Sequence, residues 1–135
     1  MERNYTTQRD AARRGIITPE LETVARKEQM RVEELLPLVA CGKVVIPANR
    51  LHTCIDPEGI GSMLRTKINV NLGVSRDCKD YDVEMQKVNS AIEMGAEAIM
   101  DLSSHGNTQP FRRKLTAECP AMIGTVPVYD SVIHY

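Results

Sequence analysis

Three short apolar runs in the second half of the chain predict β-strands. They cover residues 67–72, 96–102 and 121–129. Apolar and polar residues alternate in the first run, as they do in a strand with one buried face. Helix-like patterns follow the first two runs, and strands that alternate with amphipathic helices predict a parallel sheet built from βα units.

The ends of the three runs are evenly spaced. Asn71 lies at the end of the first, Met100 near the end of the second and Tyr129 at the end of the third, in two equal steps of 29 residues. A (β/α)8 barrel of about 250 residues uses roughly 31 residues per unit. We therefore expect an α/β fold in which residues 65–135 form the first three βα units of a TIM barrel that is incomplete in this chain.

The first part of the chain, residues 1–64, is expected to form a small and mainly helical segment. Residues 1–17 are polar and basic, which indicates a solvated arm or an arm that docks on a partner subunit. Thr18 and Pro19 have the chemistry of a helix cap and a first helical position. A second helix is expected at residues 32–40, kinked or shortened by its internal proline.

Two further helices are expected between the three strands. The first runs over residues 82–94. The second begins near Thr108 and places Phe111 and Leu115 inward. Its basic residues are expected to form a solvated face: Arg112, Arg113 and Lys114.

Composition and charge narrow the classes of function. The chain is 42% hydrophobic and 26% charged, with a net charge of −1, so no electrostatic argument favours nucleic acid or an anionic membrane. No apolar run approaches the roughly 20 residues of a membrane span. The polar N-terminus does not have the pattern of a secretory signal. We expect a cytoplasmic protein.

The four cysteines do not predict a metal site. No CxxC pair occurs among them, which argues against a structural zinc site. Their spacing also does not match a ligand set for an iron–sulfur cluster. The cysteines are Cys41, Cys54, Cys78 and Cys119. The three histidines stand alone, and His105 is the best functional candidate because it follows a strand. No catalytic constellation and no metal ligands are predicted.

Ligands of parallel α/β folds bind at the carboxyl ends of the strands. This rule selects Asn71, Met100 and Tyr129, together with residues 101–105. An amide, a thioether and a phenol suit the recognition of a flat polar ligand. For Met100 the alternative is ordinary core packing.

Six strings closely resemble phosphomethylpyrimidine synthase, the thiamine-pathway family often called ThiC. In order along essentially the whole chain they are AARRGIITPE (11–20), GKVVIPAN (42–49), DPEGIG (56–61), RTKINVNLG (65–73), AEAIMDLSS (96–104) and IGTVPVYD (123–130).

The resemblance implies a radical lyase that uses S-adenosylmethionine. It would convert 5-aminoimidazole ribotide into 4-amino-5-hydroxymethyl-2-methylpyrimidine phosphate and release formate and carbon monoxide. The resemblance further implies a [4Fe-4S] cluster, zinc, a (β/α)8 barrel and a homodimer. Substrate-binding roles carry over to Asn71, Met100 and Tyr129.

The chain departs from the family pattern in two ways. Leu51 stands where the family usually has a polar residue, which affects the surroundings of His52. The family's later substrate residues, two metal-binding histidines and C-terminal cysteine triad have no counterpart here. The resemblance therefore implies an N-terminal portion that is inactive alone and ligates none of the cofactors.

Two alternatives stay open at this point. The chain could be a noncatalytic binding or assembly module that acts on a full-length enzyme. It could also belong to the related 5-hydroxybenzimidazole synthases, which use the same ribotide.

Overall fold

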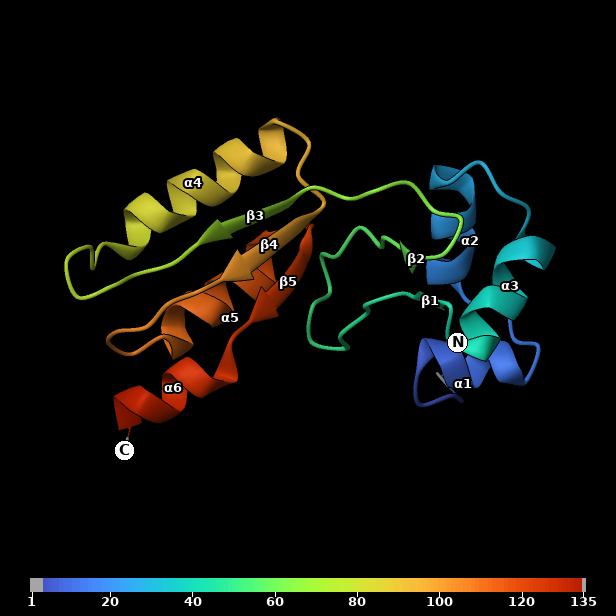
Figure 1. The fold of residues 1–135 in the computed structure, drawn as a ribbon, viewed down its shortest axis with the longest axis horizontal. Helices are drawn as coiled ribbons and strands as arrows, with labels where there is room; N and C mark the ends of the chain where they lie inside the picture. Colours follow the sequence, from blue (N-terminus) through green and yellow to red (C-terminus); the bar gives the residue numbers. More distant parts are fainter. Residues whose placement is uncertain (1–3, 135) are drawn as a thin grey trace. The chain divides into compact units, whose positions relative to one another are not determined.

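The computed structural model describes residues 4–134 and shows a mixed α/β chain (Figure 1). Internal contacts divide it into two compact units. The first takes the chain up to Ala48 together with Pro57–Thr66, and the second takes Asn49–Asp56 together with the chain from Lys67 onward. The predicted boundary after residue 64 stays a prediction. No helix of the described part is both long and apolar enough to cross a membrane.

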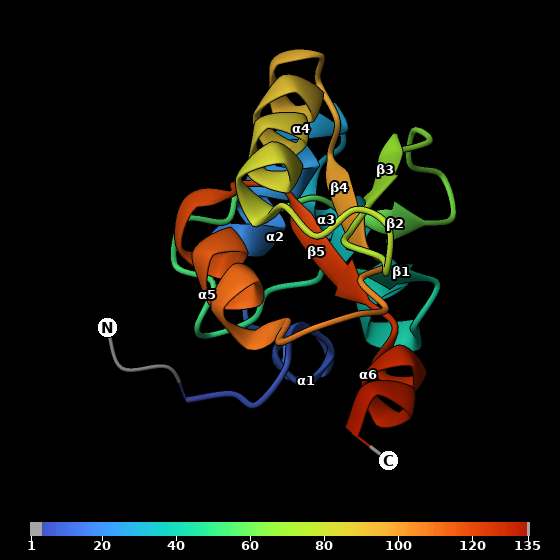
Figure 2. The same ribbon diagram turned by 90° about the vertical axis from the view of Figure 1, so that its left-hand side faces the viewer.

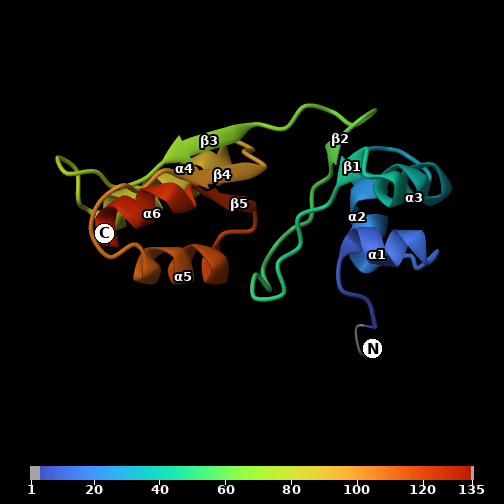
Figure 3. The same ribbon diagram turned by 60° about the horizontal axis from the view of Figure 1, so that its bottom comes forward.

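The first unit consists of helices and a two-stranded ribbon. The strands β1 and β2 pair in antiparallel fashion. Figure 3 shows the three helices beside one another, and α3 contacts both α1 and α2. The elements are α1 (Gln8–Arg13), α2 (Pro19–Lys27), α3 (Val32–Cys41), β1 (Val44–Val45) and β2 (Ile60–Gly61).

The expectation of a solvated N-terminal arm is wrong for the described residues. Ala11 and Ala12 in α1 are buried, and α1 contacts α3 within the first unit. Their methyl groups lose contact with water on packing, which stabilises the docked helix. Residues 1–3 of the predicted arm lie outside the described part of the chain.

The starts and ends of the next helices follow local chemistry. Thr18 caps α2, since its hydroxyl accepts a hydrogen bond of 3.1 Å from the backbone N–H of Leu21. This confirms the predicted helix start. The third helix continues past Pro37 to Cys41, so the proline does not shorten it.

The second unit is built on an open parallel sheet in the order β3, β4, β5. A helix follows each strand, so the unit is a run of βα repeats, as the pattern predicts. The elements are β3 (Asn69–Leu72), α4 (Tyr81–Glu93), β4 (Ala98–Asp101), α5 (Gln109–Glu118), β5 (Met122–Thr125) and α6 (Pro127–His134).

Helices α4 and α5 cover one face of this sheet (Figure 2). The core between the layers is formed by Leu72, Met85, Val88, Ile99, Phe111 and Leu115, among others. Because side chains alternate along a strand, Asn71 and Met100 lie on the opposite face. The predicted alternation in the first strand is confirmed.

Residues 49–56 dock at the amino-terminal edge of the sheet, where the chain passes from α5 into β5. The N–H of Asp56 donates to the carbonyl of Pro120 at 2.8 Å. The ring of His52 is buried, with Nε2 at 2.6 Å from the carbonyl oxygen of Cys119. The thiol of Cys54 donates to that same carbonyl at 3.3 Å.

We expect Cys119 to resist alkylation in the folded chain. Burial raises the pKa of its thiol, and this effect outweighs the hydrogen bond with the backbone of Ala121, which lowers the pKa. Since the thiolate is the reactive form, iodoacetamide at pH 8 should label Cys119 at least about tenfold more slowly than a free exposed thiol. Mass spectrometry of timed samples measures this. Cys41 and Cys78, which are exposed, are the internal controls, and equal labelling of Cys78 and Cys119 would contradict the burial.

Candidate functional site

The candidate site begins at the carboxyl ends of β3 and β4. Asn71 and Met100 are direct neighbours in the parallel register, and Gly124 of β5 is the next residue in this row. All three lie on the face that α4 and α5 leave uncovered. The structure therefore brings together two of the three residues selected from the sequence, at the edge where α/β sheets bind ligands.

The amide of Asn71 is exposed and held in place by a neighbour. Asn69, two residues earlier on the same strand face, donates from Nδ2 to Oδ1 of Asn71 at 3.1 Å. This bond uses one of the two lone pairs of the Asn71 amide oxygen and leaves its Nδ2 group as a hydrogen-bond donor. Sequence analysis did not select Asn69, although the i, i+2 spacing of two asparagines on one strand face was a usable signal.

The side chain of Met100 is half-buried and lies over Gly124. A Cβ atom added to Gly124 would come within 2.7 Å of Cε and 2.8 Å of Sδ of Met100. The absent side chain thus creates the space in which the thioether lies. A polarizable and flexible thioether suits contact with a flat ring.

The prediction that Tyr129 ends the third strand is wrong. Strand β5 ends at Thr125, and Pro127 begins α6, so Tyr129 lies in the first turn of that helix. Proline has no N–H to give to a sheet, and its fixed φ suits the first helical position. The register neighbour of Met100 in β5 is Gly124. The spacing from Met100 to its neighbour in β5 is therefore shorter than the spacing from Asn71 to Met100, and the two steps are not equal as predicted. Helix α6 continues to His134, and Tyr135 lies outside the described residues.

Tyr129 still follows β5 directly, on the segment that leaves the carboxyl edge of the sheet. Its side chain is 39% exposed. Tyr129 is therefore partly accessible, and its ligand role stays a prediction.

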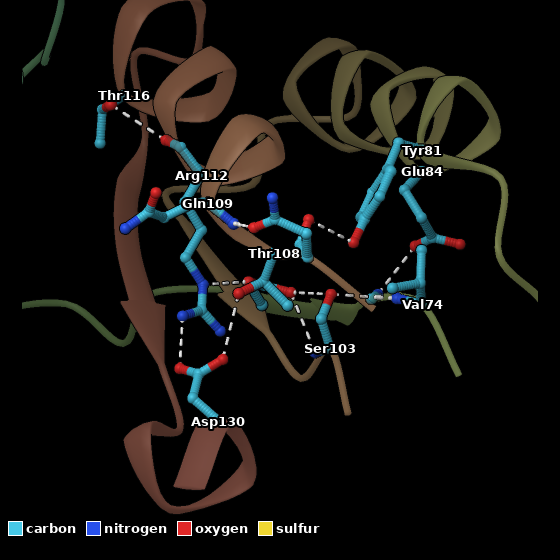
Figure 4. Close-up of polar contacts among 12 residues, drawn as sticks. Val74, Tyr81, Glu84, Ser103, Thr108, Gln109, Arg112, Thr116 and Asp130 are labelled. Carbon is cyan, nitrogen blue, oxygen red and sulfur yellow. Dashed lines mark hydrogen bonds and ion pairs between the residues drawn. The ribbon is translucent and has the colours of Figure 1, made fainter. Parts of the chain in front are cut away.

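A partly buried ion network lies on the helix side of this edge (Figure 4). Asp101 is fully buried at the end of β4 and accepts a hydrogen bond of 2.7 Å from Nε of Arg112. Nη1 of Arg112 reaches Asp130 in α6 at 2.5 Å, and the hydroxyl of Thr108 donates to the same carboxylate at 3.1 Å. The network joins β4, α5 and α6, and Asp130 directly follows Tyr129.

Sequence analysis placed Arg112 on a solvated face, and that placement is wrong. Burial alone lowers the pKa of its guanidinium, but the hydrogen bonds to Asp130 and Asp101 raise it above its usual value. Arg112 is therefore held in its charged form. Its partners come from strand and helix ends that are distant in sequence, so the pattern of one helix could not identify them.

A second set of contacts links the chain after β3 to the chain after β4. The N–H of Val74 donates to the hydroxyl of Ser103 at 3.1 Å, and this hydroxyl donates to Asp101 at 2.5 Å (Figure 4). Gly73 has a φ of 139°, and a Cβ atom there would lie 2.5 Å from the nitrogen of Ser103. The buried carboxylate of Glu84 accepts the N–H of Gly73 at 2.8 Å. These contacts fix the chain directly after Asn71.

The other sequence candidates lie elsewhere or do not form a metal centre. His105 is half-buried in the loop after β4, at the carboxyl edge. His52 lies at the opposite, amino-terminal edge, beside Cys119. The four cysteines are free. Within residues 4–134, no group of three or more His, Cys, Asp or Glu could hold a metal ion.

Comparison with known proteins identifies close relatives. A family model described as the Radical SAM ThiC family matches residues 7–135. The phosphomethylpyrimidine synthase of Clostridium botulinum strain Hall is 61% identical over 132 residues, which cover 98% of this chain and 30% of that protein. The phosphomethylpyrimidine synthase of Clostridium novyi strain NT is 60% identical with the same coverage. The chain spans about 30% of the length of these curated relatives.

Proposed function

Because the chain belongs to the radical SAM ThiC family, we propose that it forms part of the substrate site of a phosphomethylpyrimidine synthase in thiamine biosynthesis. The substrate is 5-aminoimidazole ribotide, and the product is 4-amino-5-hydroxymethyl-2-methylpyrimidine phosphate, with release of formate and carbon monoxide. The parallel sheet β3–β5 contributes the first strands of a (β/α)8 barrel, and the whole enzyme is a homodimer.

One observation carries this proposal: the register places Asn71 beside Met100 on the uncovered sheet face at the carboxyl edge. In a closed barrel this face would point inward, where a ligand can be shielded from water. A donor amide next to a thioether fits an aminoimidazole, which combines a flat ring with a nitrogen acceptor. The matching relatives are named phosphomethylpyrimidine synthase.

Each residue has a distinct role in this proposal. Asn71 donates from Nδ2 to an acceptor on the substrate, with its oxygen fixed by Asn69. Met100 packs its thioether against the ring. Tyr129 supplies its hydroxyl and ring face from α6. All three bind and orient the substrate, and none is proposed as the source of the radical.

The cofactors implied by the family do not fit the residues described here. An iron–sulfur cluster is held by cysteine thiolates, whereas the part of the chain described by the structure contains no group of residues that could hold a metal. We therefore derive no step through the cluster. We propose that this chain ligates neither the [4Fe-4S] cluster with its S-adenosylmethionine nor zinc, and that it has no lyase activity alone.

The test is Asn71→Ala in a complete enzyme. This chain would replace the matching part of the Clostridium botulinum synthase, and calorimetry would measure binding of 5-aminoimidazole ribotide. Loss of one hydrogen bond to a buried ligand should raise the Kd about tenfold, or about 1.4 kcal/mol. When the parent enzyme is supplied with its cofactors, mass spectrometry identifies the product. This measurement distinguishes a pyrimidine product from a benzimidazole product.

Asn89→Ala is the matched control, because Asn89 is an exposed asparagine of α4, the helix on the other side of the sheet. It should leave the Kd unchanged. Equal affinity of the parent and of Asn71→Ala, or no binding by the folded parent, would contradict the proposed function.

A further inference from the structure

Gly124 borders the candidate site on β5 but has no side chain to contact a ligand. It is the third member of the row Asn71, Met100, Gly124 that crosses the sheet. Glycine weakens a strand because it packs poorly and loses more freedom on folding. A glycine within a short strand often marks a place where another group approaches the backbone closely.

In this structure the group that approaches is the end of Met100. The nearest atoms to an added Cβ on Gly124 are Cε and Sδ of Met100, at 2.7 Å and 2.8 Å. The thioether therefore leans over β5, away from β3. Its direction leaves the Asn71 amide exposed on the other side of the row.

An alanine at position 124 would act on Met100 more than on the fold. The clash would involve the free end of a flexible side chain, and methionine can relieve it by rotating its χ angles. Rotation away from β5 carries the thioether toward β3, where Asn71 lies.

We propose that Gly124 is a positioning residue for substrate recognition. Because it has no side chain, it leaves room for the Met100 thioether over β5 and so keeps the Asn71 amide open to the ring of the substrate. This inference rests on the proposed function of Asn71 and Met100. Gly124 acts through Met100 and makes no substrate contact of its own. Its effect on affinity therefore depends on the presence of the methionine side chain.

A double-mutant cycle in the complete enzyme described above tests this dependence. The four proteins are the parent, Gly124→Ala, Met100→Ala and the double variant. Calorimetry measures the Kd for 5-aminoimidazole ribotide, and a thermal scan measures Tm. We expect Gly124→Ala to raise the Kd about tenfold in the parent and less than twofold in the Met100→Ala background, with Tm within about 2 °C of its background in both cases.

Three results would overturn the inference. One is an unchanged Kd for Gly124→Ala in the parent. The others are an equal rise in Kd in both backgrounds and a large fall in Tm, since either would show that Gly124 acts through the strand itself. If Asn71→Ala binds like the parent, the proposed function fails instead, so the two failures are distinguishable.

Discussion

Replacing Arg112 with methionine should lower the free energy of unfolding of the chain by about 3 kcal/mol. The change leaves the fully buried Asp101 carboxylate without its cation, and it removes the ion pair between Asp130 and α5. Removing one partner of a buried ion pair is costly because the remaining charge stays out of water. The side chain of Arg112 is 23% exposed, which admits some water and favours the lower end of the expected range.

Urea denaturation followed by circular dichroism measures this loss. Arg113→Met is the matched control: Arg113 is the next residue of the same helix and is exposed, so its replacement should change the stability by less than about 0.5 kcal/mol. Arg112→Lys keeps the charge but cannot reach both carboxylates with the same fork, and we expect an intermediate loss. Equal stabilities of the two methionine variants would show that the network contributes nothing.

Ile99→Ala should cost about 3 kcal/mol, within the range of about 2–5 kcal/mol found for such changes in protein cores. Ile99 is completely buried in the central strand β4, between Val70 of β3 and Ile123 of β5. Strands on both sides and helices above restrict any collapse of the structure around a deleted side chain. The resulting cavity therefore adds to the lost hydrophobic transfer energy.

Met94→Ala is the control for this variant, because the side chain of Met94 is 82% exposed at the end of α4. It should change the stability by less than about 0.5 kcal/mol. The comparison uses the same urea titration and requires similar m-values for both variants. A loss below about 1 kcal/mol for Ile99→Ala would contradict the packing described here.

Features set by neighbouring residues could be predicted from the sequence. The cap and proline at the start of α2 act within one helical turn, so the start at Thr18 was predicted correctly. The alternation in β3 placed Asn71 on the face away from the core for a similar reason. The prediction that Asn71 and Met100 occupy equivalent positions on neighbouring strands is also confirmed, because one βα unit of typical length separates them.

Where two local patterns competed, the prediction for the third strand failed. The run from 121 to 129 is continuously apolar or uncharged, which favours a long strand, yet Pro127 supports a helix start. The sheet pairs only Met122–Thr125 with β4, and the chain then turns into α6. The tertiary pairing, rather than the apolar run, sets the end of the strand.

The sequence by itself determined the family strings, the βα order and two of the three candidate ligands, Asn71 and Met100, because these follow from local chemistry and from spacing within one unit. The tertiary structure decided the rest: the burial of α1, the position of Tyr129 in a helix, the ion network around Arg112 and the place of Gly124 beneath Met100. Each of these depends on which distant residues meet. The role of a buried charged residue such as Arg112 depends on which oppositely charged groups contact it. The role of a glycine such as Gly124 depends on which side chain packs against its backbone.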